Sequence, residues 1–358
     1  MADTKISDSV IYIGADDHDI DLFESQYVVP NGVSYNSYVI IDEKIAVMDT
    51  ADPRVTDVWF DNLEKAFGGR KPDYLVVQHM EPDHAGNIKK LAEKYPEMKI
   101  VGNAKTFPMM KQFFTIDGLD DRSVVVKEGD TLSLGNHTLQ FVMVHWPEVM
   151  VTYEQSEKLL FSADGFGKFG ALDVEEDWAC EARRYYFNIV GKYGAQVQAL
   201  LKKASALDIK MILPLHGPIL KEDLGYYLGL YNTWSSYQPE SKGVFVAYAS
   251  IHGNTAKAAE MLGEMLKEKG AEKVVVSDLS RSDMAENIED AFRYDRIVLM
   301  ASSYDGGVFP VMEDFLMHLK SKNYQNRKIG LVENGSWAPT AARVMKGYVE
   351  NFKNVTIA

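Results

Sequence analysis

Short apolar runs separated by polar turns make up most of residues 1–242. The segment 34–50, SYNSYVIIDEKIAVMDT, predicts two strands joined by a turn at Asp42. The runs DYLVVQ (73–78) and MKIVGN (98–103) predict buried strands on either side of a helix over 87–95. Strands and a helix therefore follow one another early in the chain.

Two further runs extend this pattern. HTLQFVMVHW (137–146) predicts a strand, and MVTYEQSEKLLFSAD (150–164) predicts a hairpin whose polar turn lies at 155–157. Strands grouped in this way, with helices between some of them, predict an α/β sandwich of sheets with outer helices.

A different pattern begins at Gly243, where strands and helices alternate strictly. The predicted strands are 243–250, 272–280, 295–303 and 327–335, and the predicted helices are 254–270, 284–294 and 311–322. Helix-length connections between strands predict a parallel, doubly wound sheet.

The polar and aromatic stretch 231–242 contains Pro239 and is the natural linker between the two patterns. We therefore expect two domains, 1–242 and 243–358.

Composition excludes several classes of function. The chain has 358 residues, of which 46% are apolar, and a formal net charge of −14 that repels nucleic acid phosphates. No window approaches about 18 uninterrupted apolar residues, so we expect no membrane span. No basic and apolar leader begins the chain, and the single cysteine, Cys180, excludes an internal disulfide and suits a reducing cytoplasm. We expect a cytoplasmic protein that binds neither nucleic acid nor membrane.

Candidate metal ligands follow the strand predicted over 73–78. His79, Glu81, Asp83 and His84 lie at the point where α/β folds usually place reactive groups. Taken alone, this cluster is equally well explained as a polar turn in which Asp83 caps the next helix.

Three more positions favour the metal site. His145, Asp164 and His216 each end an apolar run and are followed by turn residues. Each alone is more often structural, but together with the first cluster they place four of the chain's eight histidines in one site.

Loops after the strands of the second pattern favour a phosphate-bearing ligand. YASIHGNT (248–255) offers hydroxyls, backbone N–H groups and a helix N-terminus, but neither G-K-[ST] nor G-x-G-x-x-G. The alternative for this loop is an ordinary turn rich in capping residues. Two glycine-rich loops with an aromatic residue follow later strands, at the edge where such sheets bind ligands. The candidate residues are Ser250, His252, Gly253, Asn254 and Thr255; Ser302, Ser303, Tyr304, Asp305, Gly306 and Gly307; and Asn334, Gly335, Ser336 and Trp337.

The whole chain resembles a known family. The series H-x-E-x-D-H, HWP, D-x-F-G and HGP is similar to that of the flavodiiron proteins, which join a metallo-β-lactamase-like αββα sandwich to a flavodoxin-like domain. Zinc hydrolases of the first fold normally carry histidine where this chain has Glu81, and the extra carboxylate favours iron. HWPEVM and DGFGKF depart from the family's commoner HWPDSM and DAFGQH, so groups around the ligands differ.

The resemblance implies specific ligands and cofactors. It assigns His79, Glu81 and His145 to one iron and Asp83, His84 and His216 to the other, with Asp164 bridging. It implies FMN in the second domain, whose fifth strand would begin at the terminal NVTIA and whose usual final helix we expect to be absent.

The same resemblance implies an activity and an assembly. The expected reaction is reduction of O₂ to water, of NO to N₂O, or both, with electrons from rubredoxin or another small donor. A head-to-tail homodimer, or a dimer of such dimers, would bring one chain's FMN to its partner's irons. The competing hypotheses are a zinc-dependent hydrolase with a flavodoxin-like docking domain and a gas or redox sensor without turnover.

Overall fold

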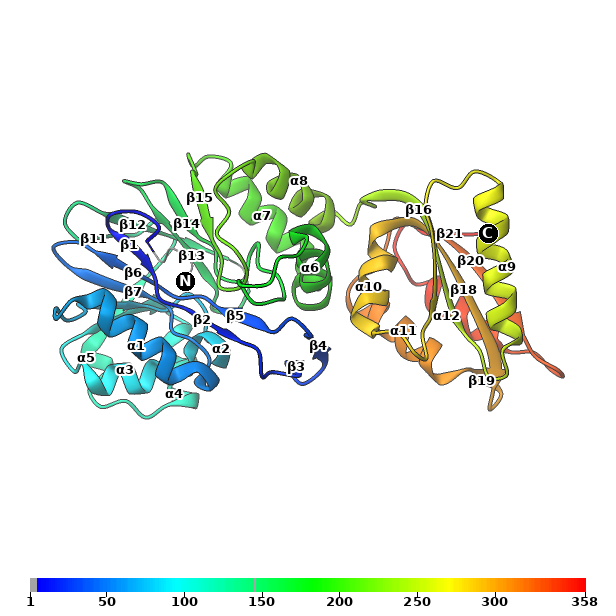
Figure 1. Ribbon diagram of the computed structural model, residues 1–358, viewed down its shortest axis with the longest axis horizontal. Helices are drawn as coiled ribbons and strands as arrows, with labels where there is room; N and C mark the ends of the chain where they lie inside the picture. Colours follow the sequence, from blue (N-terminus) through cyan, green and yellow to red (C-terminus); the bar gives the residue numbers. More distant parts are fainter. Residues whose placement is uncertain (1–4, 145) are drawn as a thin grey trace. The chain divides into compact units, whose positions relative to one another are not determined.

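The computed structural model describes residues 5–144 and 146–358 (Figure 1). Packing groups these residues into two compact units: the described residues up to Ala182 together with Ala199–Tyr227, and Arg183–Gln198 together with Leu228–Ala358. Among the helices of these residues, none combines the length and apolar character that crossing a membrane requires.

The first unit contains two large sheets. The six-stranded sheet has the order β1-β6-β7-β8-β9-β10, antiparallel from β1 to β7 and parallel from β7 to β10. Its strands are β1 (Val10–Tyr12), β6 (Tyr38–Ile41), β7 (Ile45–Met48), β8 (Tyr74–Val76), β9 (Lys99–Asn103) and β10 (Ser123–Val126). The predicted pair within 34–50 is thus confirmed as β6 and β7.

The five-stranded sheet has the order β11-β12-β13-β14-β15, in which only β14 and β15 are parallel. Its strands are β11 (Thr131–Ser133), β12 (Thr138–Met143), β13 (Met150–Glu154), β14 (Leu159–Phe161) and β15 (Met211–Leu213). Two small ribbons complete the strands: β2 (Ala15–Asp17) with β5 (Val33–Tyr35), and β3 (Leu22–Phe23) with β4 (Tyr27–Val28).

The two large sheets pack face to face. Apolar side chains of both, such as Ile40 and Val76 from one and Phe141 and Phe161 from the other, form a single buried core. The helices of the first half of the chain contact the six-stranded sheet from outside (Figure 1). They are η1 (Pro53–Val55), α1 (Thr56–Phe67), α2 (Pro82–Ala85), α3 (Ile88–Lys94), α4 (Thr106–Phe113) and α5 (Leu119–Arg122). The predicted αββα sandwich is confirmed.

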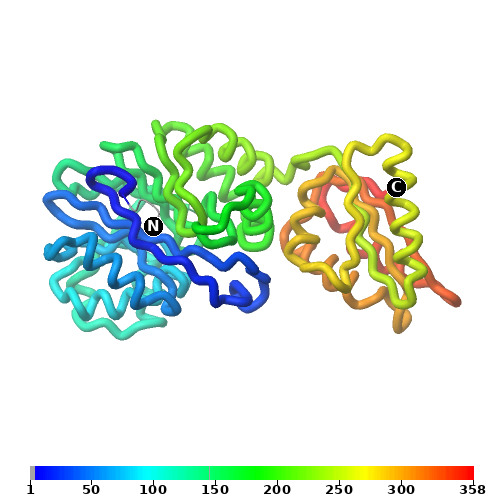
Figure 2. The backbone as a smooth tube through the Cα atoms, in the orientation of Figure 1, coloured from blue at the N-terminus to red at the C-terminus, as the bar shows by residue number. Residues whose placement is uncertain are grey.

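The second unit is built on a parallel sheet of order β17-β16-β18-β20-β21. Its strands are β16 (Ser241–Ala249), β17 (Val274–Asp278), β18 (Tyr294–Tyr304), β20 (Lys328–Asn334) and β21 (Thr356–Ile357), with β19 (Gly307–Val308) paired to β18. Its helices are α9 (Asn254–Glu268), α10 (Met284–Arg293), α11 (Pro310–Ser321) and α12 (Ala341–Val349). The parallel strands joined by helix-length connections confirm the doubly wound arrangement, and the course of this backbone can be followed in Figure 2.

Several connecting helices do not follow the simple sequence pattern. They are α6 (Trp178–Tyr185), the π-helical η2 (Tyr186–Val190), η3 (Gly191–Tyr193), α7 (Gly194–Ala204) and α8 (Leu224–Ser235). Phe187 stacks on Phe292 of α10 with ring centroids 4.2 Å apart, so part of this region belongs to the second unit. Residues 231–235, which we expected to be linker, form the end of α8, where Trp234 is buried. Helix α12 was not predicted at all.

A buried histidine links the loop between β6 and β7 to the turn between β13 and β14. His137 Nδ1 lies 2.7 Å from Asp42 Oδ2, and its Nε2 lies 3.1 Å from Glu157 Oε1. Burial opposes the charged imidazolium, but these two hydrogen bonds outweigh burial and raise the pKa of His137 above its ordinary value.

This arrangement predicts a pH-dependent contribution to stability. Because the pKa is raised on folding, protonated His137 stabilises the fold fully below about pH 6.5, the pKa of a histidine in an unfolded chain, and loses that effect as pH rises through the folded-state pKa. The urea midpoint of wild type should therefore exceed that of His137→Gln at pH 6, with the gap narrowing steadily towards pH 9. A gap that is constant across this range would contradict the assignment.

Candidate metal centre and flavin site

The metal-ligand candidates lie where strands of the first unit end. His79 and Glu81 occupy the loop after β8, and Asp83 and His84 lie in α2, which begins at Pro82. Asp164 follows β14, and His216 follows β15. His145 lies outside the described residues, so its predicted role stays a prediction.

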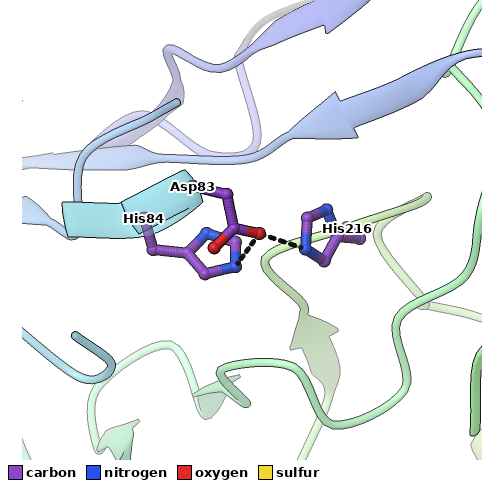
Figure 3. Close-up of side chains that lie close together, drawn as sticks. All are labelled: Asp83, His84 and His216. Atoms are coloured by element: carbon purple, nitrogen blue, oxygen red, sulfur yellow. Dashed lines mark ion pairs between the residues drawn. The ribbon is translucent and has the colours of Figure 1, made fainter. Parts of the chain in front are cut away.

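The structure gathers these side chains into two groups of three. Asp83, His84 and His216 form one group, shown in Figure 3, and His79, Glu81 and Asp164 form the other. Within each group the ligand atoms all lie within 4.8 Å of one another. Residues far apart in sequence thus converge as predicted.

The distances within the first group are short and similar. Asp83 Oδ2 lies 3.1 Å from His84 Nε2 and 3.2 Å from His216 Nε2. In the second group, His79 Nε2 lies 3.1 Å from Glu81 Oε2 and 3.4 Å from Asp164 Oδ2.

Asp164 contacts both groups through different oxygens. While its Oδ2 faces His79, its Oδ1 lies 3.1 Å from His84 Nε2. A carboxylate in this position can hold two metal ions at once, one on each oxygen.

The converging polar atoms are better suited to binding a cation than to forming hydrogen bonds with one another. Asp83 Oδ2, His84 Nε2 and Asp164 Oδ1 are buried, yet none makes a hydrogen bond within the part of the chain that the structure describes. His84 Nε2 lies 3.1 Å from both carboxylate oxygens, so the three atoms surround a common point without forming hydrogen bonds to one another. Buried polar atoms without partners are costly, and a metal ion at that point would satisfy them.

Electrostatics favour the same interpretation. Burial opposes a charge on His84, but the carboxylates of Asp83 and Asp164 outweigh it and raise the pKa of His84 to about 10. Burial likewise opposes ionisation of Asp164, but His79 and His84 lower its pKa well below the ordinary value. A site with such an excess of carboxylates attracts cations, and a metal ion competes with protons for these same atoms.

Hydrogen bonds from outside the two groups orient the histidines. His79 Nδ1 lies 2.6 Å from Glu148 Oε1, and His216 Nδ1 lies 2.7 Å from the carbonyl oxygen of Ser34. With Nδ1 engaged, each ring presents Nε2 to the site. Glu148 lies in the HWPEVM motif, where this chain departs from the family's commoner HWPDSM, and its contact with His79 was not predicted from the sequence.

Asp49 supports the ligand loop itself. Its buried carboxylate accepts hydrogen bonds from Gln78 N at 2.7 Å and Gln78 Nε2 at 2.8 Å, directly before His79. Burial, only partly offset by these bonds, raises the pKa of Asp49 to about 6. Asp49 was not among the predicted site residues, although it directly follows β7 and so has the same strand-end position as the ligands.

A pocket of ≈ 290 Å³ opens beside the two groups. It is lined by Ile20, Phe23, Glu24, Tyr35, Asp52, Glu81, Pro82 and Asp83. The Phe23 ring packs edge-on against His216, with centroids 5.4 Å apart. This pocket provides space for a small molecule next to ligands from both groups.

A third group of possible ligands, Asp16, His18 and Asp173, lies elsewhere on the first unit. His18 and Asp173 are largely exposed and pair with each other at 3.2 Å, while Asp16 accepts a hydrogen bond from Leu172 N. Its polar atoms are already satisfied by protein or open to solvent, so it lacks the features of the two buried groups.

The flavin candidates fall in three loops at the carboxyl ends of β16, β18 and β20. Gly253 has a φ of 85° directly before α9, which favours glycine, and its N–H donates to Ser250 Oγ at 3.1 Å. Thr255 Oγ1 lies 3.0 Å from Ser302 Oγ and accepts from Asn334 Nδ2 at 3.3 Å, so one hydroxyl joins all three loops.

The remaining candidates divide into exposed and structural residues. His252, Asp305, Gly306, Gly335 and Ser336 are exposed in these loops, and Asn254 begins α9. Tyr304 and Trp337 are 45% and 83% exposed, and exposed aromatic rings beside these loops suit contact with a planar ligand. Ser303 Oγ instead accepts from Thr340 N at 2.8 Å, and the carbonyl of Gly307 accepts from Thr340 Oγ1 at 2.7 Å, so these two stabilise the start of α12.

The central position of Thr255 predicts a measurable loss of flavin affinity. Thr255→Val keeps the side chain's shape but removes the hydroxyl, and one hydrogen bond to a charged group is worth about 1.5–3 kcal/mol. FMN should therefore bind about 10- to 100-fold more weakly, as measured by fluorescence titration of the flavin-free protein.

Thr233→Val is the matched control, because the Thr233 hydroxyl on α8 bonds only to the carbonyl of Gly229 in the same helix. Equal FMN affinity in wild type and Thr255→Val would exclude Thr255 from the phosphate site.

Comparison with known proteins supports both units. The sequence model described as ODP family beta lactamase matches residues 33–217, and the flavodoxin domain model matches residues 245–354. A nitric oxide reductase from Moorella thermoacetica is 31% identical, over 99% of this chain and 91% of that protein. A rubredoxin-oxygen oxidoreductase from Megalodesulfovibrio gigas is 28% identical, over 96% of this chain and 88% of that protein.

Solved structures show the same likeness. The rubredoxin oxygen:oxidoreductase from Desulfovibrio gigas superposes with a TM-score of 0.91 at 26% identity, covering 99% of this chain and 92% of that one. The flavodiiron protein from Giardia intestinalis gives 0.90 at 25% identity, covering 100% and 91%.

Fold and site together define a class: a metallo-β-lactamase-like sandwich with a His/carboxylate metal centre, followed by a flavodoxin-like domain. With relatives matched over nearly its full length, the chain belongs to the flavodiiron protein family. This membership implies a flavin and a non-haem iron site.

Proposed function

We propose that this protein is an oxidoreductase that reduces O₂ to water, NO to N₂O, or both, at two non-haem irons served by FMN. The observation that carries the proposal is the pair of ligand groups that share Asp164 beside a pocket. The names of the Moorella and Megalodesulfovibrio relatives support both substrates.

The ligand assignment is part of the proposal. One iron would be held by His79, Glu81 and His145, the other by Asp83, His84 and His216, with Asp164 between them. Glu81, Asp83 and Asp164 supply three negative charges against four positive charges from two Fe²⁺, so neither the reduced nor the oxidised pair is strongly disfavoured. Bound together, two irons and FMN can store the four electrons that convert O₂ to water.

Side chains of the pocket bind the substrate and supply protons to it. Phe23 and Ile20 give the pocket apolar walls that suit an uncharged diatomic gas. Partial burial against the pocket wall, followed by the negative charge of Glu81, raises the pKa of Glu24 above the ordinary value of a glutamate. Glu24 lies in the same pocket wall and is placed to pass protons to a reacting gas.

We propose domains 1–242 and 243–358, FMN at the three loops of the second domain, and rubredoxin or another small protein as electron donor. We further propose a cytoplasmic, head-to-tail homodimer or a dimer of dimers, in which one chain's FMN would serve the partner's irons.

The decisive experiment combines cofactor analysis with turnover. We expect two irons and one FMN per chain, together with steady-state consumption of O₂ or NO in parallel anaerobic assays with a reduced donor. Zinc without flavin would identify a hydrolase, and iron with flavin but no turnover would identify a sensor.

Glu81 separates the iron reductase from a zinc enzyme. Glu81→His replaces a hard carboxylate by the imidazole that zinc hydrolases carry there, so metal content should shift from iron towards zinc and reductase turnover should fall at least about 10-fold. Metal analysis and gas consumption on the same preparation measure both effects.

Glu93→His is the control, because it adds a histidine on the exposed face of α3, away from the ligands. If Glu81→His kept both irons and full turnover, the carboxylate would not determine metal choice.

A further inference from the structure

The turn that carries Asp164 is strained on both sides of this ligand. Ala163 has a φ of 51° and Phe166 a φ of 67°, in the left-handed region that residues with a side chain rarely adopt. Such conformations are unfavourable and persist only where the surrounding contacts hold them. On the side before Asp164, Leu215 N donates to the carbonyl oxygen of Ala163 at 2.9 Å. The side after Asp164 needs holding contacts of its own.

Lys168 supplies such contacts from a buried position. It is 4% exposed, pairs with the carboxylate of Glu176, and donates from Nζ to the carbonyl oxygen of Phe169 at 2.9 Å. The second oxygen of Glu176 accepts from Asn31 Nδ2 at 2.9 Å. The family's commoner DAFGQH has glutamine where DGFGKF has Lys168, so this buried cation departs from the usual pattern.

The fold makes room for the lysine beside the loop of a second ligand. Gly217 directly follows His216 and has a φ of 78°, and a Cβ at this position would lie 2.7 Å from Lys168 Cγ. The lysine stem therefore packs against the backbone that carries His216. Gly170 N also donates to the carbonyl oxygen of Gly32 at 3.0 Å, which fixes the same loop to the chain just before β5. Lys168 thus joins the loops of both ligands.

We propose that the buried pair of Lys168 and Glu176 positions two metal ligands. By fixing the turn of Asp164 against the loop of His216, it determines how tightly the centre holds its ions. Each group of three ligands contains one of these two residues, and Asp164 contacts both groups. Lys168 acts through the backbone and is a positioning residue. Its role rests on the metal centre of the proposed function, but not on which metal or gas that centre takes.

Chelator competition on the purified, metal-loaded protein tests this role. Lys168→Met/Glu176→Gln removes the ion pair and the bond to the Phe169 carbonyl, keeps the net charge, and leaves no single buried charge without its partner. Because the strained turn can then relax, the ligands are held less well. The EDTA concentration that removes half of the bound metal should fall about 10- to 100-fold, measured by metal analysis after the chelator is separated.

Lys168→Gln/Glu176→Gln separates positioning from a loss of charge. This variant is equally neutral, but its two amides can bond to each other and to the carbonyl oxygen of Phe169. It should therefore resist EDTA better than Lys168→Met/Glu176→Gln. A pair of glutamines that released metal as readily as the methionine variant would contradict the proposal.

Asp42→Asn/His137→Gln is the matched control. It neutralises another buried pair of the first unit, 2.7 Å apart, which lies at the end of β7 opposite Asp49. The change should lower the urea midpoint but leave metal retention as in wild type. If it released metal as readily as Lys168→Met/Glu176→Gln, any weakening of the fold would have this effect, and the proposal would be wrong.

Unchanged metal retention in Lys168→Met/Glu176→Gln excludes the proposal. If that variant does not fold, Asn31→Ala decides, because Asn31 is exposed and its side chain contributes one bond to Glu176. Its EDTA midpoint should fall about 3-fold, and a midpoint equal to that of wild type excludes the proposal. The readout counts whichever ion is bound. Zinc in wild type would therefore refute the proposed reductase while the role of Lys168 is still measured.

Discussion

Buried negative charge at the ends of strands is the constraint on which the first unit depends. Asp83 and Asp164 ionise in a region from which water is largely excluded, and Glu81, Asp49 and Glu148 add further carboxylates around the same histidines. Such a concentration of like charge opposes folding unless cations offset it. Metal binding and stability of this part of the molecule are therefore coupled, because the ions are the natural counter-charge.

The sandwich explains how this charge is assembled. Strands β8, β14 and β15 belong to two different sheets, yet the residues following them, such as Glu81, Asp164 and His216, meet at one edge because the sheets pack face to face. The apolar core between the sheets is extensive and holds the strand ends rigidly, so the ligand atoms converge without forming hydrogen bonds to one another. A rigid scaffold with unsatisfied polar atoms is well suited to hold metal ions.

The candidate ligand site of the second unit is built from neutral hydroxyl, amide and backbone N–H groups. Its parallel sheet brings three loops to one edge, where Thr255 links Ser302 and Asn334. Backbone N–H groups and hydroxyls at a helix N-terminus can bind a phosphate without a cationic side chain, as the loop sequence required. The exposed aromatic side chains of Tyr304 and Trp337 beside these loops suit a planar ring.

The sequence by itself determined the two fold types and the ligand candidates, because both depend on local regularities. Alternating apolar runs define strands, and ligand-type residues at strand ends are visible without coordinates, as for His79 and His216. Helix α12 was not predicted, because the apolar residues of its short segment were not recognised as a helical pattern. The place of the 183–198 segment could not be foreseen, because its packing on α10 depends on contacts such as Phe187 with Phe292.

Only the tertiary structure decided which side chains stand behind the ligands. Asp49, Ser34 and Glu148 reach His79 and His216 across long stretches of sequence, and a hydrogen bond between residues so far apart leaves no periodic trace in the chain.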